Sequence, residues 1–506
     1  MSAKKTNEDK SLREIASSNP ATGEILGTVK IASVEDVYSS VERARKAQQS
    51  WAKVSIEERG KRVMKLQRIL SDRCEEIAEQ ITAESGKTRY ESITMELAGL
   101  IDLIGYFGRR AHKVLANQDI PLHLFKHRRS YVHYVPRGVV GIISPWNFPF
   151  MIPFGEAVMA ILAGNAVVIK PSELTPLIAD TIVDMIEEAR LPKDLVQVVH
   201  GHGDVGAALI DSGVNYVCFT GSVATGRRVA AACGERLIPC TLELGGKAPA
   251  VVCADADLNR TAQALVWGAF ANSGQVCASV ERVYADQAIH DALLGKIVRY
   301  TQALRQGDPT RFDTDVGAIC FDRQLKVAQE LLTDAQSKGA TIHCGGKPGS
   351  QTKGQFFEPT IVSNVNHDMR CMREESFAPM LAIMAVRNEA EAIRLANDSD
   401  LGLLAYVFTS DKSKGRRLAN QIEAGTVMVN DVLVTYGAPE TPWMGVKNSG
   451  LGRVHSDEGL RELCQARHVN HDRLFSLPKE LWWYPYSEKG YKTALKALRL
   501  FFGKRF

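Results

Sequence analysis

The chain has 506 residues, of which 45% are hydrophobic and 24% are charged, and its formal net charge at neutral pH is +4. This length exceeds what one hydrophobic core usually organises, so we expect two or three domains. The small net charge gives no reason to expect a nucleic-acid partner. Ten cysteines are spread along the chain without Cys-x-x-Cys spacing, which argues against a metal site and favours reduced thiols in the cytoplasm.

The N-terminal region begins with polar and charged residues that do not resemble a signal peptide. We expect residues 1–14 to form a flexible tail. No run of about twenty apolar residues is available to span a membrane. Residues 35–118 then alternate charged and apolar positions at helical spacing, which predicts a helical region.

From residue 130 onward, short apolar runs are followed by Pro or Gly and then by helical patterns. This alternation is typical of a doubly wound parallel α/β sheet. Residues 126–138 instead alternate polar and aromatic positions, which favours an exposed or intersubunit strand. The strands expected in the α/β regions are 139–143, 166–169, 196–199 and 216–219, and then 249–253, 281–285, 380–385, 405–408 and 426–429.

The turns that follow three of these strands carry candidate functional residues. Two prolines flank Asn147 and would fix its amide as a donor for an oxyanion. Lys170 and Glu173 could bind ribose hydroxyls, and the turn from Gly221 to Gly226 could present backbone N–H groups to a phosphate. Taken singly, each turn is explained as well or better as an ordinary surface or strand–helix turn.

Cys277 lies 34 residues after Glu243, and both residues have glycine neighbours. A thiol is an effective nucleophile near neutral pH, and a carboxylate can activate the water that later cleaves an acyl-enzyme. The pair therefore suggests an enzyme that works through a thioester. The alternative for Cys277 is a small buried hydrophobe, the usual role of a free cysteine.

Six segments, in their order along the chain, closely resemble motifs of the aldehyde dehydrogenase superfamily. The opening NPATGE at 19–24 and the closing KNSGLGR at 447–453 agree as well, so the resemblance covers roughly residues 15–475. The six segments are PWNFP at 145–149, KPSE at 170–173, FTGS at 219–222, ELGGK at 243–247, GQVC at 274–277 and EESFAP at 374–379.

The resemblance implies an α/β fold with two doubly wound domains and a small oligomerisation sheet, assembled as a homodimer or homotetramer. A domain that binds NAD would comprise residues 15–123 and 139–243. A catalytic domain would comprise 244–453, and the oligomerisation sheet 124–138 and 454–478.

The resemblance also implies catalytic roles. Cys277 attacks the aldehyde, and the Asn147 amide and the Cys277 backbone N–H hold the resulting oxyanion. Hydride passes to the nicotinamide of the cofactor, and water activated by Glu243 then hydrolyses the thioester.

The cofactor residues follow from the same motifs. Lys170 and Glu173 fall at the adenine ribose, where the Glu173 carboxylate should repel a 2′-phosphate and favour NAD, although Lys170 could partly offset this repulsion and admit NADP. The turn after Gly221 falls at the pyrophosphate, and Glu375 with Phe377 at the nicotinamide. The full set is Ser144, Pro145, Trp146, Lys170, Ser172, Glu173, Gly221, Ser222, Gly226, Leu244, Gly245, Glu375 and Phe377.

The segment after Asn147 departs from many members that act on hydrophilic substrates, because Gly155 stands where they carry tryptophan. We expect this glycine to open an apolar pocket for a medium- or long-chain aliphatic or aromatic aldehyde. Alternatives are a semialdehyde or NADP-dependent enzyme of the superfamily and, less favoured, an enzyme that acylates coenzyme A. The expected pocket residues are Phe148, Phe154, Gly155, Val276, Ala278 and Trp443.

The C-terminal residues 479–506 lie outside the resemblance. An aromatic segment precedes a basic segment in which Tyr491, Leu495, Leu498 and Phe502 share one helical face. Such a helix could bind the surface of an anionic membrane through residues 482–506. It could instead cover its apolar face by docking on a neighbouring subunit.

Overall fold

The computed structural model describes residues 14–351, 353–476, 478–480 and 482–503. The chain divides into two compact units. The larger unit comprises the residues up to 115 together with 135–465, and the smaller unit comprises 116–134 together with the residues from 466 onward. Apart from its last residue, the expected N-terminal tail, 1–14, lies outside the described residues.

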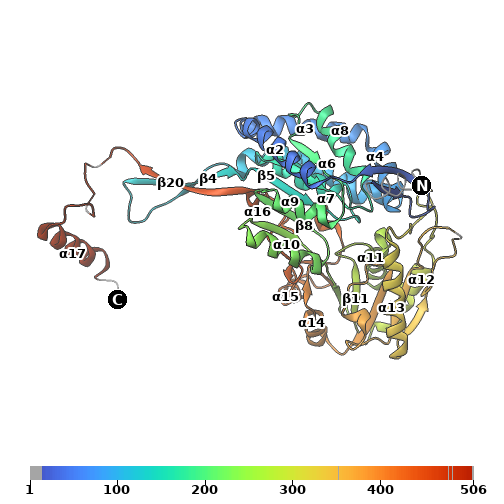
Figure 1. Cartoon of the computed structure of the whole chain (residues 1–506). Coiled ribbons are helices and arrows are strands. Elements are labelled where there is room, and N and C mark those ends of the chain that lie inside the picture. The colour runs from blue at the N-terminus through green and yellow to red at the C-terminus, as the bar shows by residue number, and fades with distance from the viewer. Residues whose placement is uncertain (1–13, 352, 477, 481, 504–506) are drawn as a thin grey trace, which may run out of the picture. The chain divides into compact units, whose positions relative to one another are not determined.

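The larger unit starts with a β-hairpin and a group of helices (Figure 1). Ser33 and Ser55 begin the first two long helices, and each hydroxyl accepts a hydrogen bond from a backbone N–H of the first turn. The helical region expected over 35–118 is confirmed, although its last helix ends at Val114. The elements are β1 (Glu14–Ser18), β2 (Ile25–Lys30), α2 (Val34–Trp51), α3 (Ile56–Asp72), α4 (Cys74–Ser85), α5 (Arg89–Glu91), the π-helical η1 (Ser92–Leu97) and α6 (Ala98–Val114).

A six-stranded sheet follows, in the order β19-β9-β8-β5-β6-β7. All neighbours are parallel except β19, which runs antiparallel to β9. The chain order reverses between β5 and β8, and such a switch point leaves a crevice for a ligand at the carboxyl ends of the strands. The elements are β5 (Val139–Ile143), α7 (Met151–Leu162), β6 (Ala166–Lys170), α8 (Leu177–Glu188), β7 (Val196–Val198), α9 (Gly203–Asp211), β8 (Tyr216–Thr220), α10 (Val223–Glu235), β9 (Cys240–Glu243) and β19 (Gly450–Leu451).

A seven-stranded sheet has the order β12-β13-β14-β11-β10-β16-β17 and is parallel except for the β12–β13 pair. Its strands are β10 (Ala248–Val252), β11 (Val280–Asp286), β12 (Thr341–Cys344), β13 (Thr360–Ser363), β14 (Met380–Val386), β16 (Leu404–Phe408) and β17 (Thr426–Val429). The accompanying helices are α11 (Leu258–Phe270), α12 (His290–Gln302), α13 (Asp322–Ser337), α14 (Glu389–Asn397) and α15 (Lys412–Ala419), whereas α16 (Ser456–Glu462) contacts α6. Short elements are η2 (Ala271–Gly274), η3 (Arg370–Met372), β15 (Leu401–Gly402), η4 (Val434–Gly437) and β18 (Val446–Lys447).

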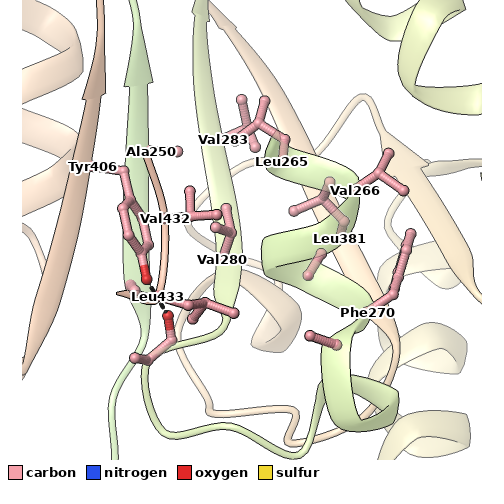
Figure 2. Packing of buried hydrophobic residues seen from close by; sticks show 14 of the residues in the cluster. Ala250, Leu265, Val266, Phe270, Val280, Val283, Leu381, Tyr406, Val432 and Leu433 are labelled. Atoms are coloured by element: carbon pink, nitrogen blue, oxygen red, sulfur yellow. Dashed lines mark hydrogen bonds between the residues drawn. The ribbon is translucent and has the colours of Figure 1, made fainter. Parts of the chain in front are cut away.

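The core of this second sheet fixes the backbone that carries the candidate nucleophile. Figure 2 shows Leu265 of α11 beside Val283 of β11, in the buried cluster that also contains Phe270 and Val280. In the same cluster the buried Tyr406 of β16 donates its hydroxyl hydrogen to the carbonyl oxygen of Ala278 at 2.6 Å. Because a buried hydroxyl needs a partner, this bond holds the chain immediately after Cys277 in place.

The smaller unit contains a three-stranded sheet in the order β20-β4-β3. Its strands are β3 (Gln118–Ile120), β4 (Arg128–Pro136) and β20 (Cys464–Asp472). The strand expected over 126–138 is therefore confirmed. The last described helix is α17 (Glu488–Phe502), none of whose side chains is buried. No described helix is both long and apolar enough to cross a bilayer.

These observations confirm the expected fold class, with two parallel α/β sheets and a small additional sheet. Each of the nine expected strands in the α/β regions is present with ends shifted by no more than about one residue.

Candidate functional site

The loop that carries Cys277 joins α11 to β11. Asn272 and Ser273, on this loop, adopt left-handed backbone angles with φ of 51° and 55°. Buried hydrogen bonds hold the conformation: the Asn272 backbone N–H donates to Glu91 Oε1 at 2.7 Å, and the Ser273 hydroxyl donates to the Gly317 carbonyl at 3.0 Å. Such local strain persists only where the surroundings fix it, and it is frequent at functional sites.

Asn147 lies against this loop. Its side-chain amide donates to the carbonyl oxygen of Gln275 at 3.0 Å, two residues before Cys277. The backbone carbonyl oxygen of Asn147 accepts hydrogen bonds from Lys87 Nζ at 3.0 Å and from the side-chain amide of Asn272 at 3.1 Å. An asparagine amide has two N–H donors, and the Gln275 bond uses one of them. The structure thus brings a pre-oriented amide next to the nucleophile loop.

Two charged residues that sequence reasoning missed position Asn147 and the start of α7. Lys87 and Glu96 form a fully buried ion pair. Glu96 Oε2 accepts the backbone N–H groups of Phe150 and Met151 at 3.0 and 2.9 Å, and Lys87 Nζ lies 4.1 Å from the centre of the Phe148 ring. The sequence shows only that Lys87 and Glu96 are charged, and it does not show that the segments around them are buried.

Glu243 ends strand β9 and is buried. Neither carboxyl oxygen has a hydrogen-bond partner of ordinary geometry among the described residues. Burial, and secondly the charge of Glu156, raise the pKa of Glu243 well above its usual range, while the nearby Trp443 side chain lowers it more weakly. These surroundings therefore favour the neutral carboxyl group over the carboxylate.

Glu156 is the one ionisable residue of α7, a helix whose twelve residues are all buried. Burial raises its pKa to about 8. Its Oε2 atom has no partner among the described residues, and the side chain borders a cavity of about 10 Å³ together with Thr241 and Arg453. Because Thr241 and Glu243 point to the same face of β9, the Glu156 side chain lies over the face that presents Glu243. Sequence reasoning gave Glu156 no role.

The thiol of Cys277 is partly exposed, whereas its surroundings disfavour a negative charge. Burial among protein atoms, followed by the charges of Glu375 and Glu243, raises the pKa of Cys277 to about 12. Two backbone N–H groups, of Cys277 and Ala278, lower the pKa in part. Those donors point at the sulfur, so the loop is arranged to receive negative charge near this atom.

The residues expected to hold a dinucleotide gather at the carboxyl ends of β5, β6, β8 and β9. Lys170, at the end of β6, forms a 3.2 Å ion pair with Glu173. Ser222 begins α10 and accepts the backbone N–H of Thr225 at 3.3 Å. A Cβ atom at Gly226 would lie 2.4 Å from the end of the Leu244 side chain, which would have to shift to admit it. The others that follow these strands are Ser144, Pro145, Trp146, Ser172, Gly221 and Gly245.

Glu375 and Phe377 reach the same edge from the loop before β14. Glu375 Oε1 accepts the Gly246 backbone N–H at 2.9 Å, and a Cβ atom at Gly245 would lie 2.6 Å from Glu375 Oε2. The Phe377 ring meets the Trp146 ring edge-on at 5.5 Å. The N-terminus of α10 and the buried Ser144 hydroxyl, which has no described partner, fit a dinucleotide at these strand ends.

A cavity of about 500 Å³ opens beside Cys277. Four of the six expected pocket residues line it, namely Phe148, Val276, Ala278 and Trp443. No lysine, arginine or histidine occurs among its described lining residues. The lining not foreseen comprises Thr94, Met95, Ala98, Gly99, Ile152, Trp267, Leu433, Val434, Tyr436, Gly437 and Ala438.

Phe154 and Gly155 do not line this cavity, which corrects the expectation that Gly155 widens it. Phe154 is fully buried with its ring centre 5.4 Å from that of Phe150. A Cβ atom at Gly155 would instead face Leu103 and Leu100 of α6 at 3.5 and 3.9 Å. The helix α7 turns this face toward α6, so the glycine permits close helix packing.

Comparisons with known proteins agree with this geometry. A model of the aldehyde dehydrogenase family matches residues 6–469. The chain is 38% identical to a 4,4'-diapolycopene aldehyde oxidase from Methylomonas over 97% of this chain and 92% of that protein. It is 35% identical to a proposed NADP(+) succinate-semialdehyde dehydrogenase of Mycolicibacterium smegmatis, over 91% and 89%.

Solved structures give the same result. A NAD-dependent aldehyde dehydrogenase from Sinorhizobium meliloti superposes with a TM-score of 0.89 and 33% identity, over 94% of each chain. The NAD+ complex of an aldehyde dehydrogenase from Bacillus cereus superposes with a TM-score of 0.87 and 30% identity, over 91% of this chain and 93% of that one. The chain belongs to the aldehyde dehydrogenase family.

Proposed function

We propose that this enzyme uses NAD to oxidise an apolar aldehyde to a free carboxylic acid, through a thioester on Cys277. The observation that carries the proposal is the cavity of about 500 Å³, which has Cys277 in an otherwise mostly apolar wall without a cationic lining residue. It lies in the unit whose crevice at the strand ends fits a dinucleotide.

The residues present can carry out each step. The Cys277 thiolate adds to the aldehyde carbon, and an Asn147 N–H stabilises the oxyanion. Glu375 and Phe377 would hold the nicotinamide next to that carbon, where NAD would supply the hydride acceptor and a positive charge that favours the thiolate over the thiol. Loss of hydride leaves a thioester. Glu243 then takes a proton from water as the water attacks the thioester, and the carboxylic acid leaves with the thiolate restored.

The apolar cavity favours an apolar aldehyde over a semialdehyde. A semialdehyde carries a carboxylate besides its aldehyde group, and this carboxylate would need a cationic or hydrogen-bonding partner once desolvated. Among its described lining residues the cavity provides only Thr94, the Cys277 thiol and the polar ends of Tyr436, Trp267 and Trp443. A succinate-semialdehyde dehydrogenase activity, the name carried by several relatives, is therefore the less favoured alternative.

The proposal for NAD is based on Glu173. Its carboxylate follows β6 at the position expected for the adenine ribose, where it would hydrogen-bond hydroxyls and repel a 2′-phosphate. The ion pair with Lys170 keeps the carboxylate in this turn. The solved relative from Sinorhizobium meliloti is titled NAD-dependent, which agrees with this choice.

Formation of NADH from hexanal, dodecanal, hexadecanal, benzaldehyde and succinate semialdehyde tests the proposal directly. Each aldehyde is supplied with NAD or NADP, with and without coenzyme A. We expect activity on the apolar aldehydes with NAD and without coenzyme A, and none in a Cys277→Ala variant. Strict dependence on coenzyme A, or activity confined to succinate semialdehyde, would contradict it.

We propose further that residues 482–503 bind the surface of an anionic membrane. Trp482 and Trp483 are each 51% exposed, and α17 presents apolar residues without burying any of them. Its basic residues are Lys489, Lys492, Lys496 and Arg499. Aromatic residues beside a basic amphipathic helix are typical of interfacial anchors. The match to the Methylomonas protein leaves only 3% of this chain uncovered, so it extends into this tail.

Sedimentation with vesicles tests the anchor. The full chain should pellet with phosphatidylserine vesicles and stay in solution with phosphatidylcholine vesicles, and a chain that ends at Pro478 should not pellet. A Lys492→Glu/Lys496→Glu variant keeps the tail and should also fail to pellet. If truncation leaves pelleting unchanged but alters the mass of the oligomer in solution, the tail docks on a neighbouring subunit instead.

The sheet β20-β4-β3 is our proposed oligomerisation surface, because its outer strands are largely exposed and carry polar residues that a second chain could pair with. A homodimer or homotetramer is expected. Light scattering of the intact chain gives the mass, and a monomer at micromolar concentration would contradict the proposal.

A further inference from the structure

A second cavity, of about 490 Å³, lies in the larger unit beside the Cys277 cavity. Its wall comes from α5, α11, α12 and the segment after α12. The lining residues are Thr88, Tyr90, Glu91, Gln263, Val266, Trp267, Phe270, Ala271, Tyr300, Leu304, Phe312, Thr314, Asp315 and Val316. We refer to it as the outer cavity.

The outer cavity and the Cys277 cavity share part of one wall. Trp267 of α11 borders both cavities. On the opposite side, Tyr90 and Glu91 line the outer cavity, while Thr94 and Met95, one helical turn further along the same helical segment, line the Cys277 cavity. Trp267 therefore lies between the two spaces, and a chain that extends from the inner space past this side chain would reach the outer one.

The two charged residues among the described lining of the outer cavity, Glu91 and Asp315, already have partners in the protein. Glu91 accepts the Thr88 hydroxyl at 2.9 Å and the Asn272 backbone N–H at 2.7 Å. Asp315 forms a two-pronged ion pair with Arg305, at 2.8 and 2.9 Å. Because these groups are already hydrogen-bonded, they would gain little from a ligand. A ligand would instead gain binding free energy by burying the apolar surface of the cavity.

Large apolar side chains are exposed around this space. Trp267 is 42% exposed, Tyr90 77% and Phe312 88%. Exposed aromatic residues that cluster at a cavity mark a binding surface more often than isolated ones do. The Arg89 guanidinium lies 5.1 Å from the centre of the Phe312 ring, which orients that ring.

We infer that the outer cavity binds the distal part of a long, unbranched apolar aldehyde whose carbonyl carbon is at Cys277. This inference rests on the proposed function and makes its substrate class more specific. Since the two cavities have similar volumes, the site accommodates about twice the chain that the inner cavity alone would hold. Long chains would then gain binding free energy from contacts with Tyr90, Trp267 and Phe312, which short chains cannot reach.

The test compares kcat/KM for hexanal, dodecanal and hexadecanal in the full-length enzyme with NAD. A Tyr90→Ser/Phe312→Ser variant removes two exposed rings that touch no catalytic residue. We expect kcat/KM for hexanal to stay unchanged and that for hexadecanal to fall about tenfold, the effect of losing part of the buried area of two aromatic side chains. A Tyr90→Leu/Phe312→Leu variant should restore most of the long-chain activity.

The matched control is Leu237→Ser, which removes a side chain that is 90% exposed and lines neither cavity. It should leave the whole chain-length series unchanged. If the double serine variant oxidises all three aldehydes as the parent does, the inference is overturned while the proposed function stands. If the parent enzyme oxidises none of them, the proposed function itself fails.

Discussion

Two buried carboxyl groups, Glu243 and Glu156, stand close enough that each disfavours a charge on the other. Burial is the larger cause of the raised pKa of Glu243, and the charge of Glu156 adds to it. Interacting groups of this kind release their protons in coupled steps. The base that hydrolyses the thioester is therefore tuned by a residue on another element.

Replacing Glu156 by glutamine should lower the pKa of Glu243, because it removes a neighbouring negative charge and keeps the volume. A lower pKa makes the carboxylate available at lower pH, so the rising limb of the kcat profile should move to lower pH. The profile is measured with a saturating short aldehyde. A Met159→Leu variant, which changes the same small cavity without changing charge, is the control. A shift to higher pH, or none, would refute this coupling.

We expect the protein to lose stability when the buried ion pair of Lys87 and Glu96 is broken. Lys87→Met leaves the Glu96 carboxylate buried without its cation, which costs about 3–5 kcal/mol for pairs of this kind. Thermal unfolding should show a large loss. Lys87→Met/Glu96→Gln should recover part of it, since the unpaired charge is gone. Equal losses in the single and double variants would show that the charge is not the cause.

At the residue scale, sequence motifs predict the roles proposed for Cys277, Glu243 and Asn147, because chemistry ties a residue type to each role. Lys87, Glu96 and Glu156 are different. Their importance comes from contacts with residues 50 or more positions away, and a local pattern does not reveal which charge is buried or which carbonyl it meets.

At the scale of elements, apolar runs predict the parallel strands well, because both faces of such strands are buried. Strands β9, β12, β13 and the two-residue β19 of these sheets are not among the expected strands. Strand β12 (Thr341–Cys344) is half-exposed and has only an alternating pattern, and the four residues of β13 follow a proline. The position of Gly155 was misjudged for a related reason: residue spacing does not say which face of α7 meets α6 and which meets the cavity.

The turn after β6 carries the prediction about cofactor choice. Glu173→Gln removes the carboxylate that would repel a 2′-phosphate, so the ratio of kcat/KM for NADP to that for NAD should rise about tenfold or more. Lys170 stays in place to attract the phosphate. Glu188→Gln, on the exposed end of α8, is the control for loss of one surface charge. An unchanged ratio would place the discrimination elsewhere.

At the scale of the whole molecule, three features suit an aldehyde with a long apolar chain. They are the apolar cavity beside Cys277, the outer cavity and the exposed basic helix α17. Aldehydes with long apolar chains partition into lipid, so a tail that binds membranes would bring the enzyme to them. The resemblance predicts the folded core of this molecule. It does not extend to residues 479–506, whose α17 was expected from its periodicity alone and is confirmed as a helix.

The central claim is that Cys277 carries an acyl group that Glu243 helps to hydrolyse. Mass spectrometry of a Glu243→Gln variant mixed with NAD and dodecanal tests it most directly. The account predicts one equivalent of NADH without further turnover, and a dodecanoyl group on the peptide that contains Cys277. Full turnover by this variant, or an intact unmodified Cys277 peptide after NADH has formed, would contradict it.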